Sequence, residues 1–205
     1  MLLVGNLIND FSLAFPRLKG MLPWHITKDL PNIILEMIAS LGDDYKVENG
    51  IAIHTTAQAE EGSVLKAPVI IGEHCFIGAH AYLRGGVLLT TYVKIGTGCE
   101  IKSSIICNNS SIAHFNFIGD SIIGCNVNFE AGAITANHLN ERADKNISVL
   151  YHNKLIATGA TKFGSLIGDN SKIGSNAVLS PGTILEPVSI VKRLELIEQV
   201  GLGDT

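Results

Sequence analysis

The fold is decided by residues 71–106, which read IGEHCFIGAHAYLRGGVLLTTYVKIGTGCEIKSSII. Large apolar residues recur there every six positions, at Ile71, Ile77, Leu83, Leu89, Ile95 and Ile101. Each is followed four residues later by a second small or apolar side chain: Cys75, Ala81, Val87, Val93, Cys99 and Ile105. An α-helix has no period of six, whereas a chain that turns the same corner every six residues does. The stretch therefore predicts a solenoid built from six-residue repeats.

The same frame covers most of the chain. It extends backward to Ile53, resets by five residues at Ile106 and again at Ile123, and returns from Ile167 to Leu185. Three short strands per turn make coils of about eighteen residues, stacked about 4.8 Å apart. We therefore expect an all-β solenoid over residues 51–187, with residues about eighteen apart lying side by side.

The segments outside the repeat are expected to be helical. Residues 1–50 contain an apolar stripe with helical spacing, with Asp29 as N-cap and Gly42 as the stop. We predict that this helical cap segment shields one open end of the solenoid, with Trp24 as a packing anchor. Residues 188–205 form the C-terminal tail, in which Val188–Val200 predicts a closing helix.

The frame is lost in an inserted loop, residues 138–161. Two stretches of this loop, 147–150 and 154–158, are separated by Tyr151, His152 and Asn153 and could pair as a hairpin. Loops of this length inside a regular domain are usually functional.

The composition narrows the function classes. With a net charge of −4, the chain has no electrostatic reason to bind nucleic acid. Its four cysteines lack C-x-x-C spacing, which favours buried free thiols in a reducing cytoplasm over disulfides or a metal site. Neither a signal peptide nor a membrane-spanning run of about 20 apolar residues is found. We expect a soluble, cytoplasmic protein.

Two cations fall on one edge of the predicted solenoid. Arg84 and Lys102 are eighteen residues apart, so they should stack about 5 Å apart and point outward. An anion such as phosphate between them would offset their repulsion. The alternative is a solvated pair, screened by salt or met by Glu100.

His114 lies next to a predicted corner. It is a candidate general base, although a single histidine among apolar residues is more often structural. His74 and His80 lie on different faces and could not easily share a metal with His114. This spacing argues against the zinc chemistry of a γ-class carbonic anhydrase.

Several stretches together resemble a known family, the C-terminal acetyltransferase domain of the bifunctional glucosamine-1-phosphate acetyltransferase/N-acetylglucosamine-1-phosphate uridyltransferase. The resemblance spans about 64–186 and is closer still to short, archaeal-type sugar-nucleotidyltransferase relatives, which carry a similar loop. The stretches are Tyr82-Leu-Arg-Gly-Gly, Glu100-Ile-Lys102, His114-Phe-Asn-Phe-Ile-Gly-Asp120, Asn126-Val-Asn128, Ala131-Gly132, Ile134-Thr-Ala-Asn137, Lys162-Phe163, Leu166-Ile-Gly-Asp169 and Gly174-Ser175.

This resemblance implies a left-handed parallel β-helix that forms homotrimers with active sites between subunits. It implies acetyl-CoA-dependent N-acetylation of an amino-sugar phosphate or nucleotide amino sugar, in UDP-N-acetylglucosamine biosynthesis. The implied roles, residue by residue, are phosphate binding by Arg84, Lys102 and Lys162, the general base for His114, orientation of sugar and acyl donor by Asn128 and Asn137, and a coenzyme A contact for Ser175. Acetyl-CoA is a co-substrate, and no metal is predicted.

The chain also departs from the family pattern. Phe117 and His138 stand where the family usually has tyrosines. We also expect no counterpart of the family's arginine-bearing C-terminal arm or of its N-terminal pyrophosphorylase domain. A non-catalytic trimeric module is therefore the alternative hypothesis. It would bind sugar phosphate or nucleotide and scaffold a separate pyrophosphorylase as its partner.

Overall fold

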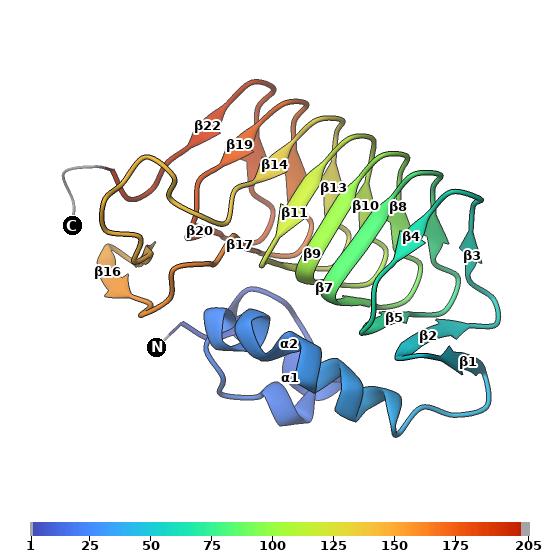
Figure 1. Cartoon of the computed structure of the whole chain (residues 1–205). Helices are drawn as coiled ribbons and strands as arrows, with labels where there is room; N and C mark the ends of the chain where they lie inside the picture. Colours follow the sequence, from blue (N-terminus) through green and yellow to red (C-terminus); the bar gives the residue numbers. More distant parts are fainter. Residues whose placement is uncertain (1, 202–205) are drawn as a thin grey trace.

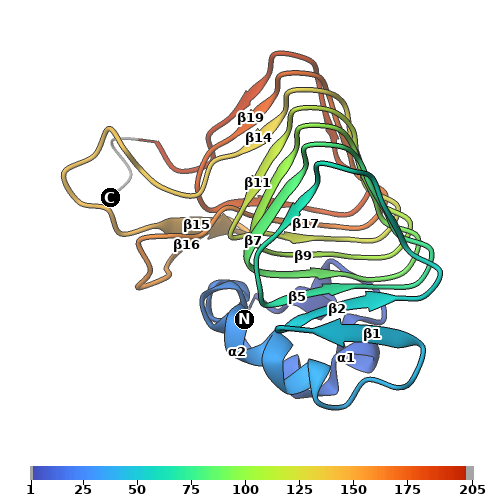
Figure 2. The ribbon, with the colours of Figure 1, turned by 45° about the vertical axis from the view of Figure 1, so that its right-hand side comes forward.

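The computed structural model describes residues 2–201 and shows a solenoid of triangular cross-section (Figure 1, Figure 2). Its strands are short and parallel, and each pairs with the strand one coil further along the chain. Ile71 pairs with Leu89, for example, and Leu89 with Ile106. The fold is a left-handed parallel β-helix, which confirms the predicted fold class.

The strands form three flat faces that meet at three corners (Figure 2). The first face contains β4 (Val64–Leu65), the first halves of β7 (Tyr82–Leu89) and β9 (Glu100–Ile106), β11 (Phe117–Gly119), β14 (Ile134–Thr135), β19 (Val178–Leu179) and β22 (Leu196–Ile197). The second face contains β2 (Ile51–His54), β5 (Val69–Ile71), the second halves of β7 and β9, β12 (Ile122–Ile123), β17 (Ser165–Ile167) and β20 (Thr183–Leu185). The third face contains β3 (Gln58–Ala59), β6 (Phe76–Ile77), β8 (Lys94–Ile95), β10 (Ser111–Ile112), β13 (Asn128–Phe129), β18 (Lys172–Ile173) and β21 (Ile190–Val191).

The repeat positions line the interior, as the six-residue period predicts. Ile77, Leu83 and Ile95 are fully buried there, and one continuous apolar core runs from coil to coil. Cys75 and Cys99 also point inward, and burial raises the pKa of the Cys75 thiol to about 11. All four cysteines are free thiols.

The N-terminal segment covers the second face of the solenoid (Figure 2). It contains two short 3₁₀ turns, η1 (Val4–Asn6) and η2 (Pro16–Leu18), and two helices, α1 (Phe11–Ala14) and α2 (Pro23–Ile38). Beneath this segment and the inserted loop, the outward side chains of the second face are buried: Ala52, Ile70, Leu88, Ile105, Ile122, Leu166 and Ile184. Complete burial of each Leu or Ile contributes about 1.5–3 kcal/mol to folding.

Helix α2 differs from its prediction in start and position. It begins at Pro23, with Leu22 as N-cap, because proline fits the first helical turn. Asp29 therefore lies inside the helix, which ends at Ile38, before Gly42. The helix contacts β5, β7 and β9 along their length rather than closing an open end.

Trp24 does act as the packing anchor that was predicted. Only 1% of its surface is exposed, and its ring packs edge-on against Phe163 with centroids 5.9 Å apart. This contact ties α2 to the end of the inserted loop. The first edge of the second face is covered separately by β1 (Tyr45–Glu48), which pairs antiparallel with β2.

The inserted loop contains the predicted hairpin. Strands β15 (Ser148–Tyr151) and β16 (Lys154–Ala157) pair antiparallel around His152 and Asn153. Both turn residues have positive φ angles, 48° and 58°, as a tight two-residue hairpin turn requires.

The predicted closing helix over Val188–Val200 is wrong. The chain continues the solenoid there as β21 and β22, which pair with β18 and β19. Val191 and Ile197 continue the six-residue spacing of apolar residues beyond Leu185. This spacing, rather than the helix-like pattern of the charged residues between them, determines the local structure. Residues 202–205 of the predicted tail lie outside the described part of the chain.

Candidate functional site

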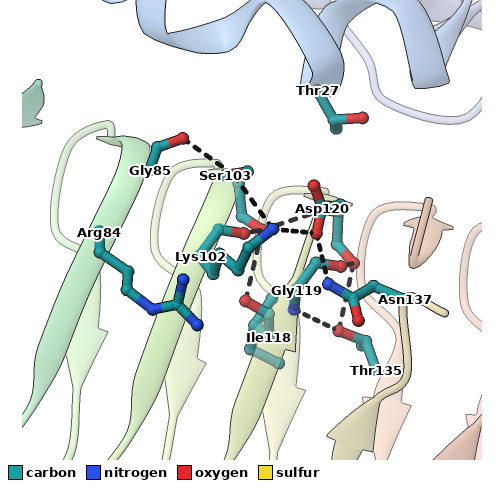
Figure 3. Close-up of polar contacts among 12 residues, drawn as sticks. Thr27, Arg84, Gly85, Lys102, Ser103, Ile118, Gly119, Asp120, Thr135 and Asn137 are labelled. Carbon is teal, nitrogen blue, oxygen red and sulfur yellow. Dashed lines mark hydrogen bonds and ion pairs between the residues drawn. The ribbon is translucent and has the colours of Figure 1, made fainter. Parts of the chain in front are cut away.

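The first and second faces meet at a corner that we call the lysine corner, formed by residues 84–86, 102–103, 119–120 and 136–137. Arg84 pairs directly with Lys102 across β7 and β9, which confirms that these two residues stack on neighbouring coils (Figure 3). Gly85 and Gly86 form a bulge immediately after Arg84, opposite the single residue Ser103.

Each of the two cations has a carboxylate partner. The Arg84 guanidinium donates to Glu100, with Nε 2.7 Å from Oε1, and Lys102 Nζ lies 2.6 Å from Asp120 Oδ2. The Glu100 contact is the one that the alternative interpretation named. A phosphate at this corner would therefore join two existing ion pairs rather than meet two bare charges.

Asp120 is the centre of the corner, although it was not among the site residues predicted from the sequence. Its Oδ2 atom accepts hydrogen bonds from both Lys102 and the side-chain amide of Asn137 (Figure 3). The residue is only 6% exposed and turns the chain with φ at 46°. Spacing alone does not predict this contact, because the coil after the bulge is one residue shorter and Lys102 pairs with Gly119 in the register, with Asp120 one residue further along.

Lys162 is brought to the same corner by the returning loop. The backbone amide of Phe163 donates to Asn137 O (3.2 Å), and that of Gly164 donates to Asp120 O (2.9 Å). Lys162 lines a cavity of ≈ 350 Å³ between α2, the lysine corner and the loop. The other lining residues are Thr27, Lys28, Pro31, Ser103, Asp120, Gly159, Ala160 and Thr161.

His114 lies at a different corner, where the third and first faces meet. We call it the histidine corner, formed by residues 79–80, 97–98, 114–115, 131–132 and 175–176. The amide of Gly132 donates to His114 O, and the amide of Asn176 donates to Ala131 O, so His114 and Ser175 lie two coils apart. Stacking at about 4.8 Å per coil separates their backbones by about 10 Å.

The imidazole of His114 is free to meet a ligand. The residue is exposed, and within residues 2–201 its ring makes no hydrogen bond. His80 belongs to the same corner and His74 to another. The described part of the chain contains no group of three or more His, Cys, Asp or Glu residues placed to hold a metal ion.

Asn128 and Ser175 lie on the histidine side of the molecule. Asn128 is exposed on the third face, between Ser111 and Lys172. The backbone amide of Ser175 donates to Glu130 Oε2 at 2.9 Å. Glu130 also pairs with Arg193, whose guanidinium lowers the pKa of that carboxyl group.

The candidate residues therefore form two groups at opposite edges of the first face. Arg84, Lys102, Asn137 and Lys162 gather around the lysine corner, whereas His114 and Ser175 mark the histidine corner. One chain alone does not combine the cations with the imidazole.

Between its two edges, the first face carries an outward row of side chains that is apolar except for Glu100, which lies between Tyr82 and Phe117. Three members are more than a third exposed: Val64 at 41%, Ile134 at 37% and Leu196 at 60%. Tyr82, Phe117 and Val178 occupy the same row on other coils.

None of the helices over residues 2–201 has the length and apolarity needed to cross a membrane.

Comparison with known proteins agrees with this architecture. A family model described as the GMPPB C-terminal domain matches residues 47–156, and one described as the hexapeptide repeat of succinyl-transferase matches residues 166–191. A solved acetyltransferase domain of PglB from Neisseria gonorrhoeae FA1090 covers 88% of this chain and 66% of its own, with 14% identity and a TM-score of 0.23. That likeness is too low to support an inference.

Curated relatives are longer proteins. The bifunctional sugar-1-phosphate nucleotidylyltransferase/acetyltransferase of Sulfurisphaera tokodaii is 33% identical over 151 residues, covering 71% of this chain and 37% of the relative. The bifunctional protein GlmU of Desulfitobacterium hafniense is 38% identical over 117 residues, covering 53% and 26%. The GlmU of Methanococcus vannielii is 34% identical over 154 residues, covering 73% and 36%. The chain thus spans little more than a third of these relatives' length at most.

The family of the chain follows from the match to the GMPPB C-terminal domain. That family model covers residues 47–156, which are more than half of the 205 residues, and the six-residue repeat runs through all three faces of the solenoid. The chain therefore belongs to the hexapeptide-repeat family of the GMPPB C-terminal domain.

Proposed function

We propose that this protein is an acetyl-CoA-dependent N-acetyltransferase acting on an amino-sugar phosphate resembling glucosamine 1-phosphate, or on a nucleotide amino sugar. Its active site would lie between copies of the chain in a homotrimer. The observation that carries the proposal is the placement of two half-sites at opposite edges of one face, whose outward row is largely apolar and partly exposed.

A threefold arrangement would complete the site. If the first faces of three copies turn toward a common axis, their largely apolar rows would be buried together, with Glu100 paired to Arg84 of the same copy. The lysine corner of each copy then adjoins the histidine corner of the next. This places Lys102 and Lys162 of one copy near His114 of its neighbour, which a single chain does not do.

The chemistry needs one base and an anion site. An ammonium cannot attack a thioester, so the sugar amine reacts in its neutral form, and the His114 imidazole takes the one proton that the amine nitrogen loses as it becomes an amide. The amine nitrogen bonds to the acetyl carbonyl carbon, the carbon–sulfur bond breaks, and the departing thiolate accepts the proton from His114. Backbone N–H groups can hold the transient oxyanion.

The remaining residues would bind and orient. Arg84, Lys102 and Lys162 would hold the sugar phosphate, Asn128 and Asn137 would orient the sugar and the acyl donor, and Ser175 would contact coenzyme A. The name of the Sulfurisphaera tokodaii relative, a bifunctional sugar-1-phosphate nucleotidylyltransferase/acetyltransferase, supports this substrate class.

A thiol-release assay with acetyl-CoA and glucosamine 1-phosphate tests the proposal. Wild type should release coenzyme A, and His114→Ala should lower kcat by about 100-fold or more, because general-base catalysis contributes that much. His80→Ala, at the same corner, is the matched control and should keep its rate. Wild-type turnover that survives His114→Ala would contradict the assigned base.

The second candidate is a non-catalytic trimeric module that binds sugar phosphate or nucleotide and scaffolds a separate pyrophosphorylase. Two observations favour this alternative: Arg84 and Lys102 already have carboxylate partners, and no hydrogen bond from residues 2–201 orients the His114 ring. Ligand binding without turnover, across a panel of amino sugars, would support it over the enzyme.

A further inference from the structure

We propose that the cavity between α2 and the lysine corner is a sugar-phosphate subsite completed by the N-terminal helix of the same chain. In it, Lys28 pairs with the phosphate and Asp120 accepts a hydrogen bond from a sugar hydroxyl. This inference rests on the proposed function and adds two substrate-binding residues to its site. It also selects a free sugar phosphate over a nucleotide-linked sugar.

The charges of the cavity suit a ligand with an anionic end and a hydroxyl-bearing end. Lys28 and Lys162 are exposed on two different walls, and neither forms an ion pair within residues 2–201. A phosphate between them gains two charge-assisted contacts without displacing a carboxylate. Lys28 and Pro31 are adjacent on one side of α2, so the helix presents this lysine to the cavity.

Asp120 gives the cavity an acceptor. Its Oδ2 atom is occupied by Lys102 and Asn137, whereas Oδ1 makes no hydrogen bond in the described part of the chain and points toward Thr27 (Figure 3). An ionised carboxylate is an acceptor only, so a free oxygen on the cavity wall fits a hydroxyl donor. The positive charge of Lys102 offsets the repulsion between Asp120 and a nearby phosphate.

The walls of the cavity are held in place by close packing. A Cβ atom on Gly86 would lie 2.9 Å from the backbone nitrogen of Pro31, so this glycine lets α2 approach the corner. The edge-on contact between Trp24 and Phe163 fixes the helix against the residue that follows Lys162. A site held this way loses little ordering entropy when it binds.

The size of the cavity favours a ligand as small as one sugar phosphate. Its volume of ≈ 350 Å³ lies near the lower end of the range for small-molecule sites, about 300–1,000 Å³. This volume suits one sugar phosphate, whereas the base, the ribose and the second phosphate of a nucleotide-linked sugar would lie outside the cavity.

Isothermal titration of the full chain with glucosamine 1-phosphate, without acetyl-CoA, tests the inference. Lys28→Ala should weaken binding on the order of tenfold, as expected for the loss of one charge-assisted contact. Lys19→Ala is the matched control, because it removes an exposed charge from the same segment outside the cavity, and it should bind like wild type. Equal affinities of Lys28→Ala and wild type would overturn the inference.

A second variant separates the two ends of the ligand. Asp120→Asn should bind inorganic phosphate more tightly than wild type, because a negative charge is lost, and glucosamine 1-phosphate less tightly, because the acceptor is weaker. Shifts in the same direction for both ligands would overturn the role of Asp120. UDP-glucosamine binding tighter than glucosamine 1-phosphate would overturn the size argument.

These outcomes are distinct from failure of the proposed function. Loss of affinity in Lys28→Ala, with no acetyl transfer by wild type, would keep the subsite and reject the enzyme. Unchanged affinity in Lys28→Ala, with turnover that depends on His114, would reject the subsite and keep the enzyme. A wild-type chain that binds no sugar phosphate would overturn the subsite directly.

Discussion

Cys107 and Cys125 have different chemistry although they lie on neighbouring coils of one corner. Cys107 is buried, whereas Cys125 is partly exposed, and both line a cavity of ≈ 260 Å³ beside the N-terminal segment. The hydrogen bond between the two thiols lowers the pKa of Cys125 and, together with burial, raises the pKa of Cys107. Because the thiolate is the nucleophile, the two residues should differ in reactivity.

We expect iodoacetamide at pH 8 to modify Cys125 before any other cysteine. Cys75 should react last or not at all, since burial removes it from solvent and raises its thiol pKa to about 11. Peptide mapping by mass spectrometry after timed alkylation measures the order. In Cys125→Ser the fast phase should disappear. Modification of Cys75 at the rate of Cys125 would contradict the burial of the interior thiols.

At the scale of elements, the contact between α2 and the lysine corner depends on a glycine. Gly86 has φ at 89°, which side chains rarely adopt, and the backbone of Pro31 lies against the space that a Cβ would need. The position of helix α2, and with it the cavity beside the lysine corner, therefore depends on the absence of a side chain at Gly86.

Gly86→Ala should lower the free energy of unfolding by about 1–3 kcal/mol through backbone strain and displacement of α2. Gly42→Ala is the control, since a Cβ there meets nothing within 4 Å, and it should change stability by less than about 0.5 kcal/mol. Urea unfolding measures both variants. Equal midpoints for the two would show that α2 is not held by this approach.

The interior of the solenoid could be predicted from the sequence, because the six-residue period identifies the residues that face inward. Ile77, Leu83 and Ile95 occupy the buried positions that the six-residue frame assigns. The last coil was not predicted from the sequence, because its corners are formed by Val188 and Leu194, with φ angles of 64° and 61°. Such residues seldom adopt this conformation, so neither carries the signal that Gly or Asn would give.

The candidate site was only partly predictable, for a related reason. Spacing places Arg84 beside Lys102, as the register shows. The pairing of Lys102 with Asp120 depends on side-chain direction at a corner, where the coil length changes after the bulge at residues 85–86. The approach of Lys28 depends on how α2 docks, which the repeat does not encode.

At the scale of the whole molecule, the proposed trimer makes each active site a joint product of two chains. A Lys102→Ala chain then keeps an intact histidine corner, and a His114→Ala chain keeps an intact lysine corner. Sites in which these two intact corners meet would be complete.

Co-expression of Lys102→Ala with His114→Ala should therefore restore acetyl transfer that neither variant shows alone. With random mixing, about a quarter of the sites would combine both intact corners. The thiol-release assay on the co-purified, differently tagged chains measures the recovery. Mixing the variants after separate purification is the control for slow exchange. No recovery in verified mixed trimers would mean that the site does not span two copies.

The inserted loop leaves the solenoid at Asn137 and rejoins it at Phe163, whose amide bonds back to the carbonyl of Asn137. The two ends of the inserted loop are thus adjacent, and the coils of the solenoid keep their length whatever the length of the loop. Over evolutionary time this detour can be lengthened, trimmed or exchanged while the scaffold keeps its register. Ligand preference can then diverge among descendants that share one unaltered frame.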